Sequence, residues 1–295
     1  MVTRTIILDG LCFGEGPRWH DGRLWLSDLI AHQVLSAEVG AVGPDPAPAV
    51  KADVAVPEQP DQLSGLGWLP DGDLLVVAMG ERRVLRLRDG VPSTHADLSG
   101  LGRHHVNDMV VRGDGFAYVG QMGYDFHSHG MRPEPMPLIG VAPDGTARAV
   151  ADDLHCANGM ALSPDSGTLI VAESAARRLT AFDVACDGSL SGRRVFAPLG
   201  ERDHPDGICL DAAGAVWVAC PVARRFVRVV EGGEVTDVID LEPDRHAIAC
   251  VLGGPDRRTL LMVTAGTLGD AERSRELRVG RVEAARVDVP GAGTP

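Results

Sequence analysis

The stretch 204–219, HPDGICLDAAGAVWVA, contains the local pattern from which the fold can be predicted. Asp206 and Gly207 are followed by a short apolar run, a turn at 211–214 and a second apolar run. Two apolar runs of about five residues around a turn rich in Asp and Gly are typical of a β-hairpin. The stretch therefore predicts two antiparallel strands, with a polar residue at the start of the first.

This pattern occurs six times along the chain. Its first positions form a column of residues separated by 43 to 51 positions, a period typical of four-stranded propeller blades. The other copies are 15–26 (EGPRWHDGRLWL), 64–78 (SGLGWLPDGDLLVVA), 107–119 (NDMVVRGDGFAYV), 158–172 (NGMALSPDSGTLIVA) and, more loosely, 249–264 (ACVLGGPDRRTLLMVT). The column is Glu15, Ser64, Asn107, Asn158, Asp206 and Ala249.

The repeats predict an all-β fold, a single six-bladed β-propeller domain over 1–295 with four-stranded blades around a central channel. Segments between the copies, such as 83–87, supply the outer strands. The pieces 3–8 and 281–289 fall outside whole repeats, so we expect the N-terminal strand to close the last blade and remove an exposed edge. A two-sheet sandwich is the competing architecture, but the near-constant period favours radial repetition. The best helix candidate is short, near 271–275.

Composition restricts the class of protein. The net charge is −13 and the sequence has no basic cluster, which argues against nucleic acid or an anionic membrane as a partner. The N-terminus lacks the long apolar core of a signal peptide, and no apolar run approaches the length of a membrane span. Six dispersed cysteines without a CxxC pair indicate small buried hydrophobes in a reducing compartment. We expect a cytoplasmic globular protein that acts on a small molecule, with no obligatory protein partner.

The column is a candidate metal site. The innermost strand of each propeller blade runs along the channel, so equivalent strand starts converge near one mouth of it. Carboxylates and carboxamides facing an enclosed channel repel one another or stay unsatisfied without a partner. A divalent cation would remove the repulsion and satisfy the polar groups. Glu15 and Asp206 would balance its charge, and Asn158 would add a carbonyl oxygen. Such an all-oxygen set suits Ca²⁺, Mg²⁺ or Mn²⁺. The alternative is that Asn and Asp before Gly simply form turns.

Several short motifs occur in an ordered set that resembles a known family. They are GEGPRW at 14–19, Asn107-Asp108, Asn158-Gly159, PDG at 205–207 with VWVA at 216–219, and GG at 253–254 followed by VT at 263–264. With this set the chain resembles the SMP-30/gluconolactonase family of regucalcin-like proteins over essentially its whole length. The resemblance implies a six-bladed propeller that carries one divalent metal in its channel.

Carried over residue by residue, the resemblance implies that Glu15, Asn158 and Asp206 are the metal ligands. Asn107 matches a position that lies beside the metal and contacts substrate, and Asp206 also matches the residue proposed as general base. The implied cofactor is one divalent cation, with Ca²⁺ first and Mg²⁺, Mn²⁺ or Zn²⁺ as alternatives.

The sequence departs from the family's sugar-lactone hydrolases at two positions. Those enzymes carry an arginine two positions before the match to Asn107, where this chain has His105, and a glutamate near the end of the following strand, where it has Asp125. Both positions contact sugar hydroxyl groups in those enzymes. His105 and Asp125 are therefore candidate substrate contacts, and the particular lactone stays open.

The predicted activity is metal-dependent hydrolysis of a lactone, either a sugar lactone or a related cyclic ester. The cation would polarise the carbonyl, and Asp206 would activate water. His104 and His105 either assist substrate binding and proton transfer or are solvated loop residues. Two other functions stay open, a metal-binding propeller without catalysis and a propeller recruited to a different reaction on a small molecule.

Two further kinds of site fit the sequence less well. A nucleophilic triad is disfavoured because the sequence contains no GxSxG elbow. His127 and His129 lack the usual partners of a zinc site, so we expect a substrate-covering or solvated loop there.

The shape of the pocket would indicate the class of substrate. A small polar pocket would favour sugar lactones, whereas a broad apolar one would favour a hydrophobic ester or lactone.

Overall fold

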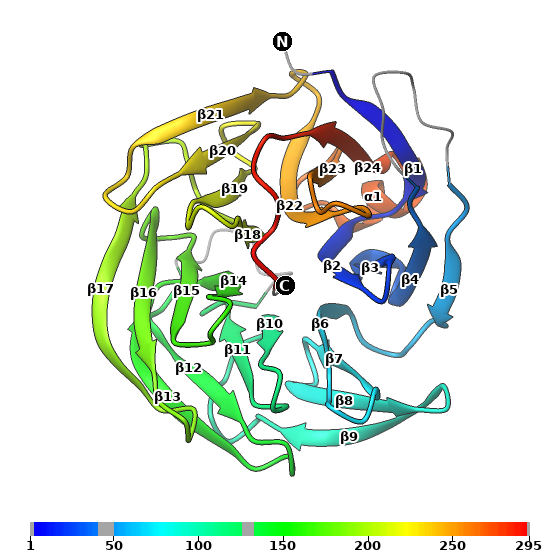
Figure 1. The fold of residues 1–295 in the computed structure, drawn as a ribbon. Helices are drawn as coiled ribbons and strands as arrows, with labels where there is room; N and C mark the ends of the chain where they lie inside the picture. The colour runs from blue at the N-terminus through cyan, green and yellow to red at the C-terminus, as the bar shows by residue number, and fades with distance from the viewer. Residues whose placement is uncertain (1–2, 41–49, 126–132, 294–295) are drawn as a thin grey trace.

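The computed structural model describes residues 3–40, 50–125 and 133–293. In these parts of the chain, 24 strands form six four-stranded sheets arranged as a ring around a central channel (Figure 1). Neighbouring strands within each sheet are antiparallel. Each sheet is one blade, and the predicted six-bladed β-propeller is confirmed.

Each blade has four strands, and the first one named for each blade lies at the channel. The first blade has β2 (Gly14–His20), β3 (Arg23–Asp28), β4 (Gln33–Glu38) and β5 (Asp53–Val56). The second has β6 (Leu63–Trp68), β7 (Leu74–Ala78), β8 (Arg83–Arg88) and β9 (Val91–Asp97), and the third has β10 (Val106–Val111), β11 (Ala117–Gln121), β12 (Met136–Val141) and β13 (Ala147–Leu154). The fourth has β14 (Ala157–Leu162), β15 (Thr168–Glu173), β16 (Arg178–Val184) and β17 (Leu190–Pro198), and the fifth has β18 (Ile208–Leu210), β19 (Val216–Cys220), β20 (Arg225–Val229) and β21 (Val235–Asp240). The sixth has β22 (His246–Gly253), β23 (Thr259–Ala265), β24 (Gly280–Arg286) and β1 (Thr5–Leu11).

The β18–β19 hairpin shows how the repeated sequence pattern produces a blade. Asp211 Oδ1 accepts hydrogen bonds from the backbone N–H groups of Ala213 at 2.8 Å and Ala215 at 3.1 Å. Gly214 has a φ of +80°, in the region that glycine adopts without steric cost. Asp211 Oδ2 accepts a further bond from Arg228 Nε on β20 at 2.7 Å. The turn aspartate therefore closes the hairpin and also anchors the third strand.

The N-terminal strand lies in the last blade. β1 pairs antiparallel with β24 and takes the outer edge of the sixth sheet. A chain of polar contacts crosses this blade: Arg4 Nη1 donates to Glu283 at 3.0 Å, Thr264 Oγ1 donates to Glu283 at 3.0 Å, and Arg245 Nη2 donates to Thr264 Oγ1 at 2.6 Å. Chain segments from both ends of the sequence thus share one sheet, which closes the ring.

Bulges mark the column positions. In β2, β6, β10, β14 and β22 the pairing with the second strand shifts by one residue, in an interval that contains or borders the column residue. A bulge locally disrupts the ladder and re-aims side chains. The innermost strands therefore bend at the level where the polar residues of the column occur.

Gly159 lets two innermost strands approach each other. Its N–H donates to the Asp206 carbonyl oxygen at 3.3 Å. A Cβ atom at position 159 would lie 2.6 Å from Ile208 N and 2.7 Å from the Asp206 carbonyl oxygen, closer than side chains tolerate. Asn158 and Gly159 lie within β14 rather than in a turn. The glycine after the column residue is thus a packing requirement between the fourth and fifth blades.

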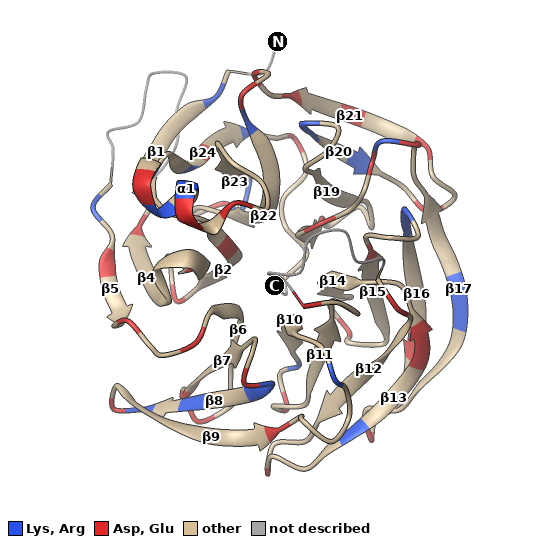
Figure 2. Ribbon diagram, turned by 180° about the vertical axis from the view of Figure 1, so that it is seen from behind, with Lys and Arg blue, Asp and Glu red and all other residues tan. Residues whose placement is uncertain are grey.

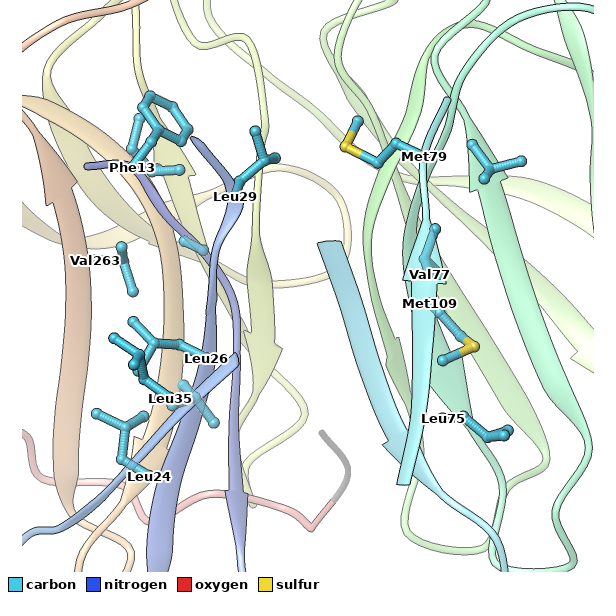
Figure 3. Close-up of a cluster of buried hydrophobic side chains, with 14 of the residues drawn as sticks. Phe13, Leu24, Leu26, Leu29, Leu35, Leu75, Val77, Met79, Met109 and Val263 are labelled. Atoms are coloured by element: carbon cyan, nitrogen blue, oxygen red, sulfur yellow. The ribbon is translucent and has the colours of Figure 1, made fainter. Parts of the chain in front are cut away.

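Packing between blades is apolar, and charge is concentrated outside. Figure 3 shows two groups of buried side chains: Leu24, Leu26 and Leu35 lie near Val263, and Leu75 and Val77 lie near Met109. Figure 2 shows many of the charged residues on outer strands such as β8 and β17. Inner strands such as β7 and β10 are buried along their whole length, whereas the outer strand β9 is mostly exposed. Exposure therefore increases from the channel outward within a blade.

A short helix, α1 (Ala271–Leu277), follows β23 and confirms the helix expected near 271–275. Its N-cap, Asp270, accepts a hydrogen bond from Arg273 N at 2.9 Å. Arg275 Nη2 donates to the Ile30 carbonyl oxygen at 2.6 Å, which attaches the helix to the 3₁₀ turn η1 (Leu29–Ala31). No helix in the described part of the chain has the length and apolar character needed to cross a membrane.

We expect Gly159→Ala to reduce the free energy of unfolding by about 2 kcal/mol or more, because the added methyl group overpacks the junction of β14 and β18. Gly113→Ala is the matched control, since a Cβ there meets nothing within 4 Å. It should change stability by less than about 0.5 kcal/mol. Urea denaturation of both variants checks this, and equal effects would contradict the packing role of Gly159.

Candidate functional site

Four polar residues of the predicted column share one pocket. Glu15 on β2, Asn107 on β10, Asn158 on β14 and Asp206, two residues before β18, all line a cavity of about 630 Å³. They come from four different blades. Only closure of the ring brings them together, so the structure unites the residues that the sequence places at equivalent strand starts.

The other two column members lie beside the pocket rather than in its lining. Ser64 is buried, and its hydroxyl donates to Asn107 Oδ1 at 3.4 Å, which helps to orient that carboxamide. Ala249 is buried against Gly207. A Cβ atom added at position 207 would lie 2.3 Å from the Ala249 methyl group. Small residues at these two places leave room for the longer polar side chains.

A hydrogen-bond network around Ser174 supports Asn158, and no sequence motif pointed to it. Asn158 Nδ2 donates to Ser174 Oγ at 3.3 Å, and the serine hydroxyl donates to the Pro205 carbonyl oxygen at 2.6 Å. His204 Nδ1 lies 3.0 Å from the Ser174 carbonyl oxygen. Ser174 and His204 both line the pocket. Ser174 directly follows β15. Its position after the second strand of a repeat is the one sequence feature from which its place in the pocket could have been predicted.

The two carboxyl groups of the site are electrostatically uncompensated. Burial raises the pKa of Glu15 well above its ordinary value, and the nearby carboxylates of Asp206 and Asp108 raise it further. Burial also raises the pKa of Asp206 to about 8, although its hydrogen bond with Asn158 opposes this shift. Each raised pKa means that the protein as it stands disfavours the charged carboxylate. A positive charge placed between them would reverse that preference.

Arg18 is a positive charge that acts on Glu15 and lowers its pKa, but less than burial and the nearby carboxylates raise it. Its Nη2 donates to Asp108 Oδ1 at 2.6 Å, and both side chains are buried. Arg18 Nε also donates to the Leu66 carbonyl oxygen at 3.1 Å, so this arginine joins β2, β6 and β10. Because Asp108 occupies the guanidinium directly, Arg18 leaves the charge of Glu15 and Asp206 largely unbalanced.

The residues present fit a hard cation. The pocket offers two carboxylates and two carboxamides, and the described residues contain no group of three or more His, Cys, Asp or Glu side chains arranged to hold a metal. An oxygen donor set with amide contributions suits Ca²⁺, Mg²⁺ or Mn²⁺ better than the nitrogen and sulfur ligands typical of zinc. Glu15, Asn158 and Asp206 line the same pocket, and their joint role as ligands stays our prediction.

The remaining predicted site residues lie elsewhere. Asp125 is half-exposed, and its Oδ1 lies 3.3 Å from Nδ1 of the buried His104. His105 lines a second cavity, of about 620 Å³, together with Asp61 and residues of α1. Neither Asp125 nor His105 lines the pocket that holds Glu15 and Asp206. Their roles as substrate contacts stay predictions.

The proposed loop histidines, His127 and His129, lie outside the described residues. All six cysteines have free thiols, and Cys186 is the exposed one. Cys156 lines the pocket, and burial raises the pKa of its thiol to about 12, so this thiol stays protonated at neutral pH.

The fold and the site together define a six-bladed propeller with clustered carboxylates and carboxamides at its channel. A family model described as the SMP-30/gluconolactonase/LRE-like region matches residues 13–266. The chain therefore belongs to the SMP-30/gluconolactonase/LRE-like family, and the resemblance seen in the sequence motifs is confirmed.

Individual relatives agree with this assignment. The chain is 28% identical over 306 residues to a pentonolactonase of Haloferax volcanii, covering 100% of this chain and 97% of that protein. It is 31% identical over 161 residues to a 6-deoxy-6-sulfogluconolactonase of Pseudomonas putida, a match that spans only about half of that relative, 55% of its length. The solved structure of a calcium-binding protein, regucalcin, from Agrobacterium tumefaciens has the same fold, with a TM-score of 0.79 at 20% identity over 100% of this chain and 97% of that one.

We expect Arg18→Met to lower the free energy of unfolding by about 3 to 5 kcal/mol, because it leaves Asp108 buried without its partner. The double variant R18M/D108N should recover part of this loss, since it removes the stranded charge. Arg23→Met breaks the more exposed pairs with Glu38 and Asp53 and a hydrogen bond to Ser36, and should cost about 1 kcal/mol or less. Urea denaturation measures all three, and a double variant no more stable than R18M would contradict the charge argument.

Proposed function

We propose that this protein is a divalent-cation-dependent hydrolase of lactones. The observation that carries the proposal is the meeting of Glu15, Asn107, Asn158 and Asp206 in one pocket. Membership of the SMP-30/gluconolactonase/LRE-like family supports it, as do the names of two relatives, a pentonolactonase and a 6-deoxy-6-sulfogluconolactonase. The six dispersed cysteines support a cytoplasmic location, where thiols stay reduced.

Glu15, Asn158 and Asp206 would hold the cation through oxygen donors, which suit Ca²⁺, Mg²⁺ or Mn²⁺, and Ca²⁺ is our first choice. The calcium-binding description of the Agrobacterium relative supports that choice. When bound, the ion would supply Lewis-acid polarisation of the lactone carbonyl and a lowered pKa for an adjacent water. Ser174 would keep the Asn158 side chain in place through the hydrogen bond between them.

The hydrolytic step needs a base, and Asp206 is our candidate. A water oxygen forms a bond to the carbonyl carbon while Asp206 takes a proton from that water. The bond between the carbonyl carbon and the ring oxygen then breaks. The ring oxygen receives the proton from Asp206, and the product is a hydroxy acid. Asn107, whose side chain Ser64 orients, would hold the substrate by hydrogen bonding beside the reacting carbonyl.

Cation binding should stabilise the folded protein. Ca²⁺ at about 100 times its dissociation constant is expected to add about 2.7 kcal/mol to the free energy of unfolding and to raise Tm, and EDTA should reverse the shift. The double variant E15Q/D206N should lose this response because both charges that hold the ion are gone. E58Q/D9N carries the same substitutions at exposed positions and should respond like the parent protein. An unchanged Tm response in E15Q/D206N would place the cation elsewhere.

Turnover of lactones should depend on Asp206. With a panel of aldono- and alkyl-substituted δ-lactones at fixed pH and saturating Ca²⁺, Asp206→Asn should lower kcat by about 100-fold or more, the range that a general base contributes. Asp9→Asn, an exposed change of the same kind, should leave kcat unaltered. Wild-type turnover by Asp206→Asn would exclude its role as base. Cation binding without turnover of any lactone would favour a non-catalytic propeller or a different reaction.

A further inference from the structure

The same loop of every blade reaches over the pocket. In the first four blades, the residue directly after the second strand lines the pocket. In the fifth blade, the first two residues after the second strand line it, and in the sixth blade the third residue after that strand does so. A second column, independent of the polar one, therefore surrounds the channel mouth. It consists of Leu29, Met79, Met122, Ser174, Pro221 with Val222, and Leu268.

Five of the six blades contribute an apolar side chain there. We call Leu29, Met79, Met122, Val222 and Leu268 the apolar collar. Figure 3 shows Leu29 and Met79 projecting at the same level from neighbouring blades, at the same end of the cluster as Phe13. Phe13 also lines the pocket.

The collar is partly open to solvent. Leu29, Met79 and Met122 are buried, whereas Val222 is 42% exposed and Leu268 is 46% exposed. Large exposed apolar side chains grouped at a concave site are typical of ligand-binding surfaces. Val222 and Leu268 come from adjacent blades and would lose this exposure when an apolar group enters the pocket.

Among the described residues that line the pocket, two polar groups near the collar already have partners. The Ser174 hydroxyl already donates to the Pro205 carbonyl oxygen, and His204 Nδ1 is engaged with the Ser174 carbonyl oxygen. Asp125 and His105, the predicted sugar contacts, lie outside this pocket. A substrate hydroxyl placed against the collar would lose its hydration without gaining a partner, which costs free energy.

Resting on the proposed lactone hydrolysis, we infer that the substrate is a lactone whose ring carries an apolar substituent, an alkyl chain or an aryl group, seated against the apolar collar. The lactone carbonyl would lie toward Glu15, Asn107, Asn158 and Asp206, on or just before the innermost strands. The substituent would extend outward between Met79, Val222 and Leu268. The pocket volume of about 630 Å³ is within the range of pockets that hold drug-sized ligands, so it accommodates a ring and a substituent together.

The experiment uses two matched series on the purified protein with Ca²⁺. The first is a set of δ-lactones with unsubstituted, short, medium and long alkyl chains, with glucono-δ-lactone for comparison, assayed for kcat/KM. The second is the corresponding alkyl δ-lactams, which resist hydrolysis, measured by calorimetry. We expect both kcat/KM and lactam affinity to rise about threefold to fourfold per buried methylene over the first few carbons. Glucono-δ-lactone should be the poorer substrate.

The collar is tested with Val222→Thr and Leu268→Asn combined, which keep side-chain size but remove apolar character. This double variant should lose about tenfold in affinity for the longest lactam and change little toward the unsubstituted one. Val235→Thr with Leu277→Asn is the matched control, since these residues are 45% and 46% exposed outside the pocket. It should bind like the parent protein.

The two arms separate the two proposals. Lactam affinity that does not rise with chain length, or equal behaviour of the two double variants, overturns the collar inference whatever the turnover. Chain-dependent lactam binding that the collar variant weakens supports the inference, even if no lactone is hydrolysed. That last result would overturn lactone hydrolysis alone.

Discussion

The close approach of innermost strands around a narrow channel is the constraint on which the site depends. Gly159 has no room for a Cβ because the backbone of the fifth blade lies directly against it. Gly65 shows the same restriction, with a Cβ placed only 2.3 Å from Met109 N. These contacts bring strands from neighbouring blades into backbone contact. The polar residue before each of these glycines is thereby held at the channel, with little freedom to move away from the others.

The electrostatics of the pocket follow from this geometry. Glu15 and Asp206 come from blades distant in sequence, but ring closure places them in one pocket. The charge of Asp108 acts on both and raises the pKa of each. Arg18 balances Asp108 through a direct contact and ties three blades together. Arg18 thus links the innermost strands of three blades. It does not neutralise the two pocket carboxyl groups, which need another positive charge. A protein that only needed a stable channel would gain more from apolar residues at these positions.

The pocket divides into two chemical zones built from different parts of each blade. Residues on or just before the innermost strands supply carboxylates and carboxamides, and the loops after the second strands supply the apolar collar. Strands hold the carboxylates and carboxamides in fixed positions, whereas loop residues can change the polarity and shape of the pocket entrance. Relatives that share the fold can therefore share the inner zone and differ in the groups that surround it. Selectivity for one lactone over another would then be determined by the collar rather than by the residues proposed to hold the cation.

The sequence by itself determined the repeat, the number of blades and the column, because hairpin formation depends on local turn residues such as Asp211 and Gly214. It also singled out Glu15, Asn107, Asn158 and Asp206, since equivalent positions in repeats occupy equivalent places in a ring. Only the tertiary structure decided which other side chains join them. Ser174, the collar and the pairing of Arg18 with Asp108, 90 residues further along the chain, depend on loop paths and distant neighbours that no local pattern specifies. His105 lies only two residues from Asn107, yet Asn107 lines the pocket and His105 lines a separate cavity.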